Sequence, residues 1–313
     1  MENFDLENPL MSSQEHQSDT MPRLFAAESD HMPCEQYFRS IETRDLEVSV
    51  RKEAVALILQ EQFTNRFDPF ISYLAVNYLD RYIASQGMPQ GKPWILKLVA
   101  TSCLSLASKM KKTNFFLTDF RKEEGFIFDT PTIQRMELLI LGALKWRMRS
   151  ITPFSFIQFF LSFFMLKDPP LRDALKARAK EIIFKVQNEI KILEFKPSII
   201  AASALLSAAH ELFPIQFPCF KNAISSCVEV NKEKLFSCWN VMQGIVVDGK
   251  ESGFDMASSS DTPVNVLDLH CSSAESDKTI SIDTTTVKYN YNWRGGRHQK
   301  EAGSNTAIQQ TKK

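Results

Sequence analysis

The stretch PWILKLVATSCLSLASKM, residues 93–110, decides the fold of this chain. Apolar or small side chains occupy nearly every position, so no polar face is left that is wide enough to meet solvent. Lys97 and four hydroxyl side chains lie inside the run, which is not typical of a membrane span. We therefore expect a helix that is buried all round, with small residues such as Ala100 and Ala107 letting neighbouring helices come close.

A similar helix recurs 101 residues later, in a segment that a proline, Pro197, again opens. The matched positions are Leu98, Val99, Ala100, Ser102, Leu104 and Ala107 in the first copy and Ile199, Ile200, Ala201, Ser203, Leu205 and Ala208 in the second. The offset indicates two similar domains in tandem. The alternative is that any two buried helices made of Ala, Ser and Leu align this well.

The composition favours a helical protein with a protein partner. A length of 313 residues allows about two domains, and 44% apolar residues with 24 phenylalanines provide a sizeable core. Lys plus Arg and Asp plus Glu both number 37, so the chain lacks the basic field of a protein that wraps nucleic acid. We expect no nucleic-acid and no membrane partner. The start of the chain lacks the apolar core of a signal peptide, so we expect an intracellular protein.

No motif for catalysis, metal or cofactor binding is present. The six cysteines form no C-x-x-C pair and the five histidines form no cluster, which argues against a zinc site. The sequence has no P-loop, G-x-G-x-x-G, H-E-x-x-H or G-x-S-x-G motif. We therefore expect a protein that is not an enzyme and that needs no cofactor.

The pattern of helix signals divides the chain into four parts. Residues 1–33 are polar and aperiodic, and residues 247–313 are rich in Ser, Asp and Thr, so both are predicted to be disordered. Residues 34–150 form the first domain, and residues 151–246 form the second. Each domain is predicted to hold five helices. The clearest begins at Asp68 and Pro69, a natural N-cap and first-turn proline, and ends before Gly87.

The other helices are placed by apolar spacing. In the first domain they are predicted at residues 45–63, 93–110, 117–124 and 130–146, and in the second at 154–166, 171–193, 197–212, 217–228 and 231–246. The strongly apolar segment at 154–166 is too short to span a bilayer.

The sequence of the first domain resembles the first cyclin box of D-type cyclins. The resemblance rests on LAVNYLDRYIASQ (residues 74–86), KPWILKLVATSCLSLASKMKKT (92–113), TIQRMELLILGALKWRM (132–148) and TPFSF (152–156). The segment LEFKPSIIAASALL (193–206) resembles the second cyclin box. Short segments such as HMPCEQYF and FPCF are similar to those of the plant class-six D-type cyclins, a group that lacks a retinoblastoma-binding motif. The implied fold is all-α, with two tandem five-helix cyclin boxes between disordered N- and C-terminal tails.

The resemblance implies an activating subunit of a cyclin-dependent kinase that controls the start of the cell cycle or formative cell division. The lysine and glutamate with which the family grips the kinase fall on Lys109 and Glu137. Glu137 shares a helical face with apolar residues, an odd place for a carboxylate unless it marks the rim of an interface. Without this resemblance, we would interpret each residue as an ordinary charged side chain in solvent at the end of a helix.

Departures from the family pattern limit what can be carried over. The substrate-docking patch would fall on Val50, Arg51 and Leu57, but Val50 and Leu57 replace the usual Met and Trp, so the patch is degenerate. Lys112 stands in a stretch where an acidic residue is common. The motif L-x-C-x-E has only a near miss at residues 32–36, MPCEQ, so we expect no docking to a retinoblastoma-type protein by this route.

Two alternatives stay open besides kinase activation: a kinase-binding adaptor that does not activate, and a transcription factor that binds DNA with tandem cyclin folds. Kinase inhibitor proteins are further expected partners. Thr262, which precedes a proline, is a candidate phosphorylation site. The family implies a location in the nucleus, and also in the cytoplasm.

Overall fold

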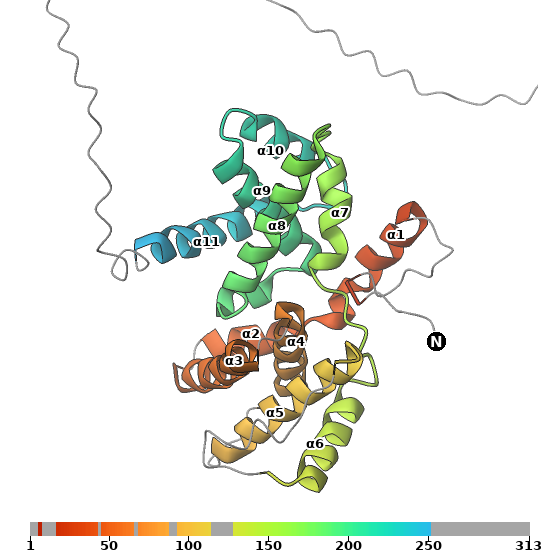
Figure 1. The fold of residues 1–313 in the computed structure, drawn as a ribbon, viewed down its shortest axis with the longest axis vertical. Coiled ribbons are helices and arrows are strands. Elements are labelled where there is room, and N and C mark those ends of the chain that lie inside the picture. Colours follow the sequence, from red (N-terminus) through yellow and green to blue (C-terminus); the bar gives the residue numbers. More distant parts are fainter. Residues whose placement is uncertain are drawn as a thin grey trace, which may run out of the picture. The chain divides into compact units, whose positions relative to one another are not determined.

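Helices make up all the regular structure that the computed structural model describes (Figure 1). The described residues are 6–7, 17–42, 45–65, 68–87, 93–113 and 128–251, and all of them belong to the unit Met1–Ser258. Among these residues, no helix has the length and apolar character needed to cross a membrane. The all-α prediction is therefore confirmed.

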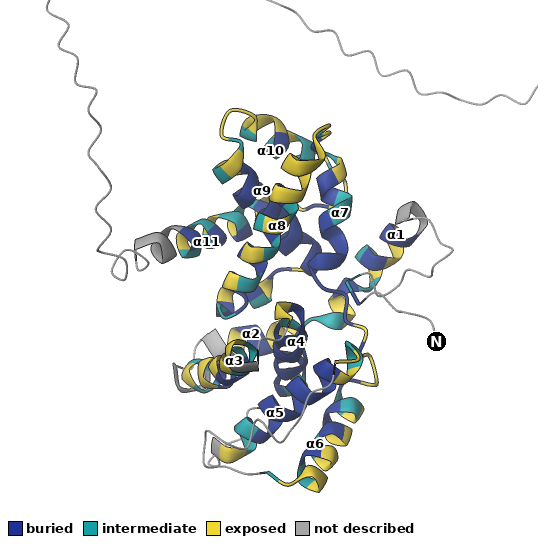
Figure 2. Cartoon of the chain, viewed as in Figure 1, coloured by how far each residue is buried: buried dark blue, intermediate teal, exposed yellow. Residues whose placement is uncertain are grey.

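The first box is built around helix α5, the stretch from which the fold was predicted. Its described helices are α2 (Glu35–Glu42), α3 (Asp45–Asn65), α4 (Pro69–Gln86), α5 (Pro93–Met110) and α6 (Thr130–Ala143). Helix α5 packs against α3, α4 and α6, and every residue from 98 to 108 is buried (Figure 2). The helix predicted at 117–124 lies outside the described residues.

Helix α4 begins and ends where its sequence signals predict. The Asp68 carboxylate accepts a hydrogen bond from the backbone N–H of Phe70 at 3.0 Å, and Pro69 occupies the first turn. At the other end, Gly87 adopts φ 82° and donates its N–H to the Ile83 carbonyl. Only glycine adopts this left-handed conformation without steric cost, so Gly87 stops the helix.

The second box repeats the plan around α9. Its helices are α7 (Phe154–Ser162), α8 (Pro169–Val186), α9 (Pro197–Leu212), α10 (Phe217–Ser225) and α11 (Lys232–Glu251), with a 3-10 helix η2 (Ile190–Glu194) before α9. Helix α9 contacts the other four α-helices of this box and is buried from Pro197 to Ala209. The prediction of two tandem boxes is confirmed.

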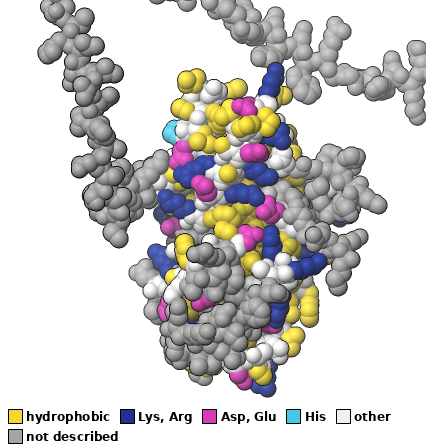
Figure 3. Space-filling view, viewed as in Figure 1, with side chains coloured by type: hydrophobic (Ala, Val, Ile, Leu, Met, Phe, Trp, Pro, Cys, Tyr) yellow, Lys and Arg dark blue, Asp and Glu magenta, His cyan; other side chains and the backbone are white. Residues whose placement is uncertain are grey.

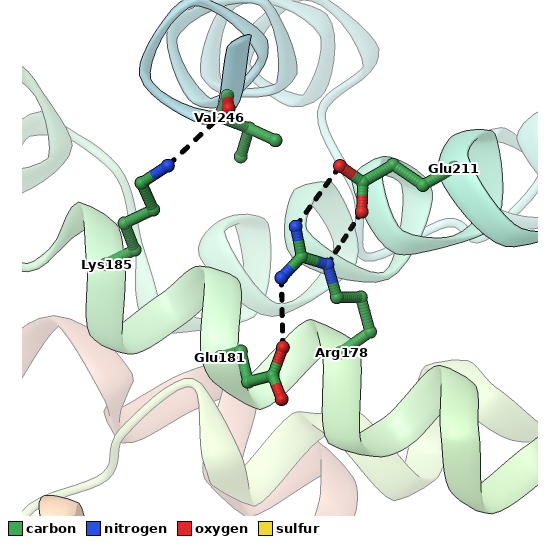
Figure 4. Close-up of polar contacts among 5 residues, drawn as sticks. All are labelled: Arg178, Glu181, Lys185, Glu211 and Val246. Carbon is green, nitrogen blue, oxygen red and sulfur yellow. Dashed lines mark hydrogen bonds and ion pairs between the residues drawn. The ribbon is translucent and has the colours of Figure 1, made fainter. Parts of the chain in front are cut away.

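Polar side chains join three helices of the second box, as Figure 4 shows. Arg178 of α8 donates two hydrogen bonds to the Glu211 carboxylate of α9, at 2.6 and 3.2 Å, and one to Glu181 at 2.9 Å. The hydrogen bonds to Glu211 raise the pKa of Arg178. The Lys185 amine donates to the carbonyl of Val246 in α11 at 3.5 Å. Helix α8 is thus tied to both α9 and α11.

The helix predicted over 171–193 is wrong at its end, because α8 stops at Val186. The carbonyls of Gln187 and Asn188, which a continuing helix would use internally, instead accept hydrogen bonds from Arg51 of the first box. The apolar pattern nevertheless continues, because Ile190 and Ile192 of η2 are buried in the same core.

The prediction that residues 1–33 are disordered is wrong for residues 17–31, which form α1 (Gln17–Ala27) and the 3-10 helix η1 (Glu28–His31). Phe25 of α1 meets the rings of Phe156, Phe159 and Phe160 in α7, with centroids 5.0 to 6.4 Å apart. Pro22 interrupts the helical pattern in the sequence, and the stabilising partners lie far away in the chain. Similarly, α11 continues to Glu251, beyond the expected boundary at residue 246.

Candidate partner-binding site

The structure brings Lys109 and Glu137 together. The Lys109 amine lies 2.6 Å from both carboxylate oxygens of Glu137. Lys109 stands in the last turn of α5, where a cation is favoured by the helix dipole, and Glu137 stands in the middle of α6. The pair therefore joins two helices of the first box across their packed faces.

The two members of this pair differ in exposure. Glu137 is only 7% exposed, and its carboxylate also accepts a hydrogen bond from the Ser105 hydroxyl at 2.6 Å. The side chain of Lys109 is 56% exposed. Since Ser105 and α6 fix the carboxylate, Glu137 orients an amine that still faces solvent and can bind an acceptor on another molecule.

Large apolar side chains are exposed on α6 and in the turn that follows it. Leu138 and Leu139 follow Glu137 in α6 and are 61% and 59% exposed, and Trp146 in the turn after α6 is 68% exposed. We call these three residues the α6 stripe. Lys145 and Trp146 have φ angles of 51° and 59°, and the Trp146 N–H donates to the Leu141 carbonyl at 2.9 Å. This C-terminal turn keeps Trp146 close to α6.

The predicted substrate-docking patch needs a correction at Arg51, which is fully buried. Its Nε and Nη2 atoms donate to the two oxygens of Asp80, at 2.7 and 2.9 Å. Its Nη1 donates to the Asn188 carbonyl at 3.0 Å. Leu57 is also buried and Val50 is half-buried. Arg51 is therefore an internal link between the boxes and cannot contact a docked substrate.

Burial lowers the pKa of Arg51, but the nearby Asp80 carboxylate raises it by more, so the net pKa of the guanidinium is raised. The carbonyls of Gln187 and Asn188 accept two further hydrogen bonds from the guanidinium, which helps to offset the cost of burying its charge. Asp80 was not singled out from the sequence. The available signal was that Asp80 lies in α4, a helix expected to be largely buried. A buried carboxylate needs a cation as its partner.

Sequence reasoning also missed Ser105 and the α6 stripe. Ser105 was interpreted only as a small residue in a buried helix, and its hydroxyl instead holds Glu137. The stripe could not be separated from core residues by spacing alone. Among the described residues, no three His, Cys, Asp or Glu side chains gather in a way that could hold a metal ion.

Two family models match the chain, "Cyclin, N-terminal domain" over residues 19–149 and "Cyclin, C-terminal domain" over residues 151–259. A relative from Arabidopsis thaliana, named putative cyclin-D6-1, is 46% identical over 296 residues, which cover 90% of this chain and 95% of the relative. The chain belongs to the plant D-type cyclins.

Other comparisons agree with this membership. Cyclin-D6-1 of Oryza sativa subsp. japonica is 39% identical over 89% of this cyclin and 86% of the relative. A solved viral cyclin from herpesvirus saimiri is 19% identical, with a TM-score of 0.52, and covers 63% of this cyclin and 86% of the viral chain. At that identity, the likeness shows the fold alone. Membership of the cyclin family supports a regulatory rather than a catalytic role toward a cyclin-dependent kinase.

Proposed function

We propose that this cyclin activates a cyclin-dependent kinase that controls the start of the cell cycle or formative cell division. The observation that carries the proposal is the Lys109–Glu137 pair together with the α6 stripe, which belongs to the same helix as Glu137 and the turn after it. An exposed apolar surface next to an oriented charge is the composition of a protein interface, with an apolar centre and a polar rim. Location in the nucleus is part of this proposal.

The proposed mechanism follows from what a kinase needs. The catalytic lysine of a kinase must pair with a glutamate on a movable helix. A partner that binds only the inward position of that helix shifts the population toward the active state. The α6 stripe would cover the apolar side of the kinase helix, and the Lys109 amine would donate to its exposed carbonyls. The cyclin contributes shape and charge but no chemical step.

Internal pairing makes the charged part of this surface less costly to bury. A lone lysine would lose its hydration at the interface, and that loss offsets much of the gain. Lys109 keeps Glu137 as a counter-charge whether or not a kinase is bound, and Glu137 keeps the Ser105 hydroxyl. Reversing either charge would leave the other member of the pair beside a like charge.

The rival role as a DNA-binding factor finds little support. Among the described residues on the face shown in Figure 3, basic and acidic side chains are interspersed and form no basic stripe. The net charge is zero, whereas binding to a polyanion needs a field of one sign. The absence of L-x-C-x-E docking stays a prediction. It is supported by helix α2, which begins at Glu35 in the middle of the near-miss motif.

The test is co-purification of the full chain with plant cyclin-dependent kinases, followed by a phosphorylation assay. We expect Lys109→Glu and Glu137→Lys each to weaken binding by about 2 to 5 kcal/mol and to abolish activation. The double reversal should restore the internal ion pair but not the binding, because a carboxylate at position 109 cannot donate to the kinase carbonyls. The matched control is Arg172→Glu, a charge reversal at an exposed position of α8 in the second box, which should leave binding unchanged.

The assay separates the remaining roles. Tight binding without a rise in kinase activity would identify an adaptor. Failure to bind any kinase would reject the proposed function and leave only the family and the fold. Thr262 lies outside the described residues, and its phosphorylation stays a prediction.

A further inference from the structure

A pocket of about 340 Å³ opens between α4, the turn after α6 and the segment that joins η1 to α2. Its charged lining residues are Arg81, Lys145, Arg147 and Asp30. Apolar residues, including Met32, Pro33 and Leu144, form much of the remaining wall. Three cations and one carboxylate therefore face the same space.

Arg81 is the most unusual of these residues, because it is a buried charge without a counter-charge. It is 7% exposed, and within the described part of the chain only its Nη1 atom has acceptors. These are the Arg147 carbonyl at 3.1 Å, the Ser150 hydroxyl at 3.0 Å and the Asn77 side-chain oxygen at 3.5 Å. All three are neutral, and no carboxylate among the described residues pairs with it. Arg51, by contrast, has Asp80.

The surroundings do not neutralise Arg81. Asp30 is paired with Arg147 at 2.8 Å, and within the described part of the chain the Lys145 amine has no polar partner. Burial lowers the pKa of Arg81, the neighbouring Arg147 acts in the same direction, and together they outweigh Tyr78 and bring this pKa to about 10. Arg81 lines the pocket, and its Nε and Nη2 atoms have no hydrogen-bond acceptor among the described residues. An uncompensated guanidinium at a concave surface is a site for an anion.

We propose that this pocket binds the phosphorylated side chain of a serine or threonine in a partner protein. A phosphoryl group carries a charge of about −1.5 to −2, which matches the two positive charges that remain after Arg147 pairs with Asp30. The forked guanidinium of Arg81 suits phosphoryl oxygens, and Lys145 adds a flexible second donor. The apolar wall and the volume, which is near the lower end for ligand pockets, favour a side chain over a bare ion.

The test uses the full chain and a pool of short peptides with phosphoserine or phosphothreonine at the centre and mixed flanking residues. We expect phosphorylated peptides to be retained over their unphosphorylated counterparts. Lys145→Ala should weaken the selected peptide about tenfold, as expected for one charge-assisted hydrogen bond. The matched control is Lys112→Ala. Lys112 is also an exposed turn lysine with a left-handed φ, 55°, and its replacement should leave the affinity unchanged.

A second readout avoids variants of Arg81, which also holds the turn after α6. His31 lies close enough to Arg81, Arg147 and Asp30 for all three to influence its titration. A bound phosphoryl group should raise the pKa of His31, which NMR of the imidazole measures. A peptide that binds elsewhere on the chain would leave the pKa of His31 unchanged.

Several results would overturn the proposal. Equal binding of phosphorylated and unphosphorylated peptides would show that the pocket does not recognise the phosphoryl group. Inorganic phosphate that binds as tightly as the selected peptide would mean a free-ion site. Binding to phosphoinositide vesicles but not to peptides would assign the pocket to lipid headgroups, and an unchanged affinity in Lys145→Ala would place the binding elsewhere.

Discussion

His31 shows how the environment of one side chain sets a dependence on pH. Its Nδ1 atom is buried without a hydrogen-bond partner. Burial, followed by the positive charges of Arg81 and Arg147, lowers its pKa from 6.5 to about 4. Between these two values the unfolded chain binds a proton at this residue and the folded chain does not. The contribution of His31 to the free energy of unfolding therefore rises as pH increases through this window.

We expect His31→Gln to remove this contribution. The difference in free energy of unfolding between the native chain and the variant should grow from about pH 4 to about pH 6.5 and stay constant above it. Urea titrations at several pH values measure this difference, and other titrating groups cancel because both chains share them. A difference that is independent of pH would show that His31 has an ordinary pKa.

At the residue scale, resemblance to a family pointed to the lysine at the end of α5 and the glutamate of α6, and the structure brings the two into contact. Their role in binding a kinase stays a prediction. Sequence reasoning could not predict the internal role of Arg51. The acceptors of its hydrogen bonds lie 29 residues away in α4 and 136 or 137 residues away after α8. Local periodicity contains no information about such distant partners.

Helix α9 depends on another element for its N-terminal cap. Its own N-cap residue, Lys196, makes no side-chain cap hydrogen bond. Glu28 of η1 fills this role, because its carboxylate accepts from the backbone N–H of Ser198 at 2.9 Å and from the Ser198 hydroxyl at 3.0 Å. Burial raises the pKa of Glu28, against the opposing effect of these hydrogen bonds. The segment predicted as disordered thus completes the central helix of the second box.

We expect Glu28→Ala to lower the free energy of unfolding by about 1 to 2 kcal/mol, because the buried N–H of Ser198 loses its acceptor. Glu28→Gln should lose less, since one amide oxygen can still accept and no charge is buried. Chemical denaturation measures both, with Glu53→Ala, at an exposed position of α3, as the control. Equal stability of Glu28→Ala and the native chain would show that water satisfies the end of α9.

At the scale of the whole molecule, the repeated buried helix was enough to predict two boxes, but not what joins them. One link is α1 with η1, which packs Phe25 against α7 and caps α9 through Glu28 in the second box. On the side of the first box, the His31 carbonyl of η1 accepts a hydrogen bond from the Asn77 side chain of α4 at 3.0 Å. The other is Arg51, which pairs with Asp80 in the first box and reaches the carbonyls after α8 in the second. Neither link follows a pattern that repeats along the chain, so only the structure reveals them.

The Arg51–Asp80 pair offers a test of how the boxes are joined. Both residues are at most 2% exposed, so removing one partner leaves an uncompensated buried charge. We expect Arg51→Ala and Asp80→Ala each to lower the free energy of unfolding by about 3 to 5 kcal/mol. The double variant Arg51→Met with Asp80→Leu should lose less than either single change, because apolar side chains of similar length fill the space without charge.

Denaturant titrations of the three variants, followed both by tryptophan fluorescence and by far-ultraviolet circular dichroism, measure these losses. The double variant still lacks the donors for the carbonyls of Gln187 and Asn188. We therefore expect its two probes to report separate transitions, whereas coincident transitions in the native chain would show cooperative unfolding of the two boxes. If the double variant were as unstable as the single ones and unfolded in one step, Arg51 would matter for packing in the first box and not as a link between boxes.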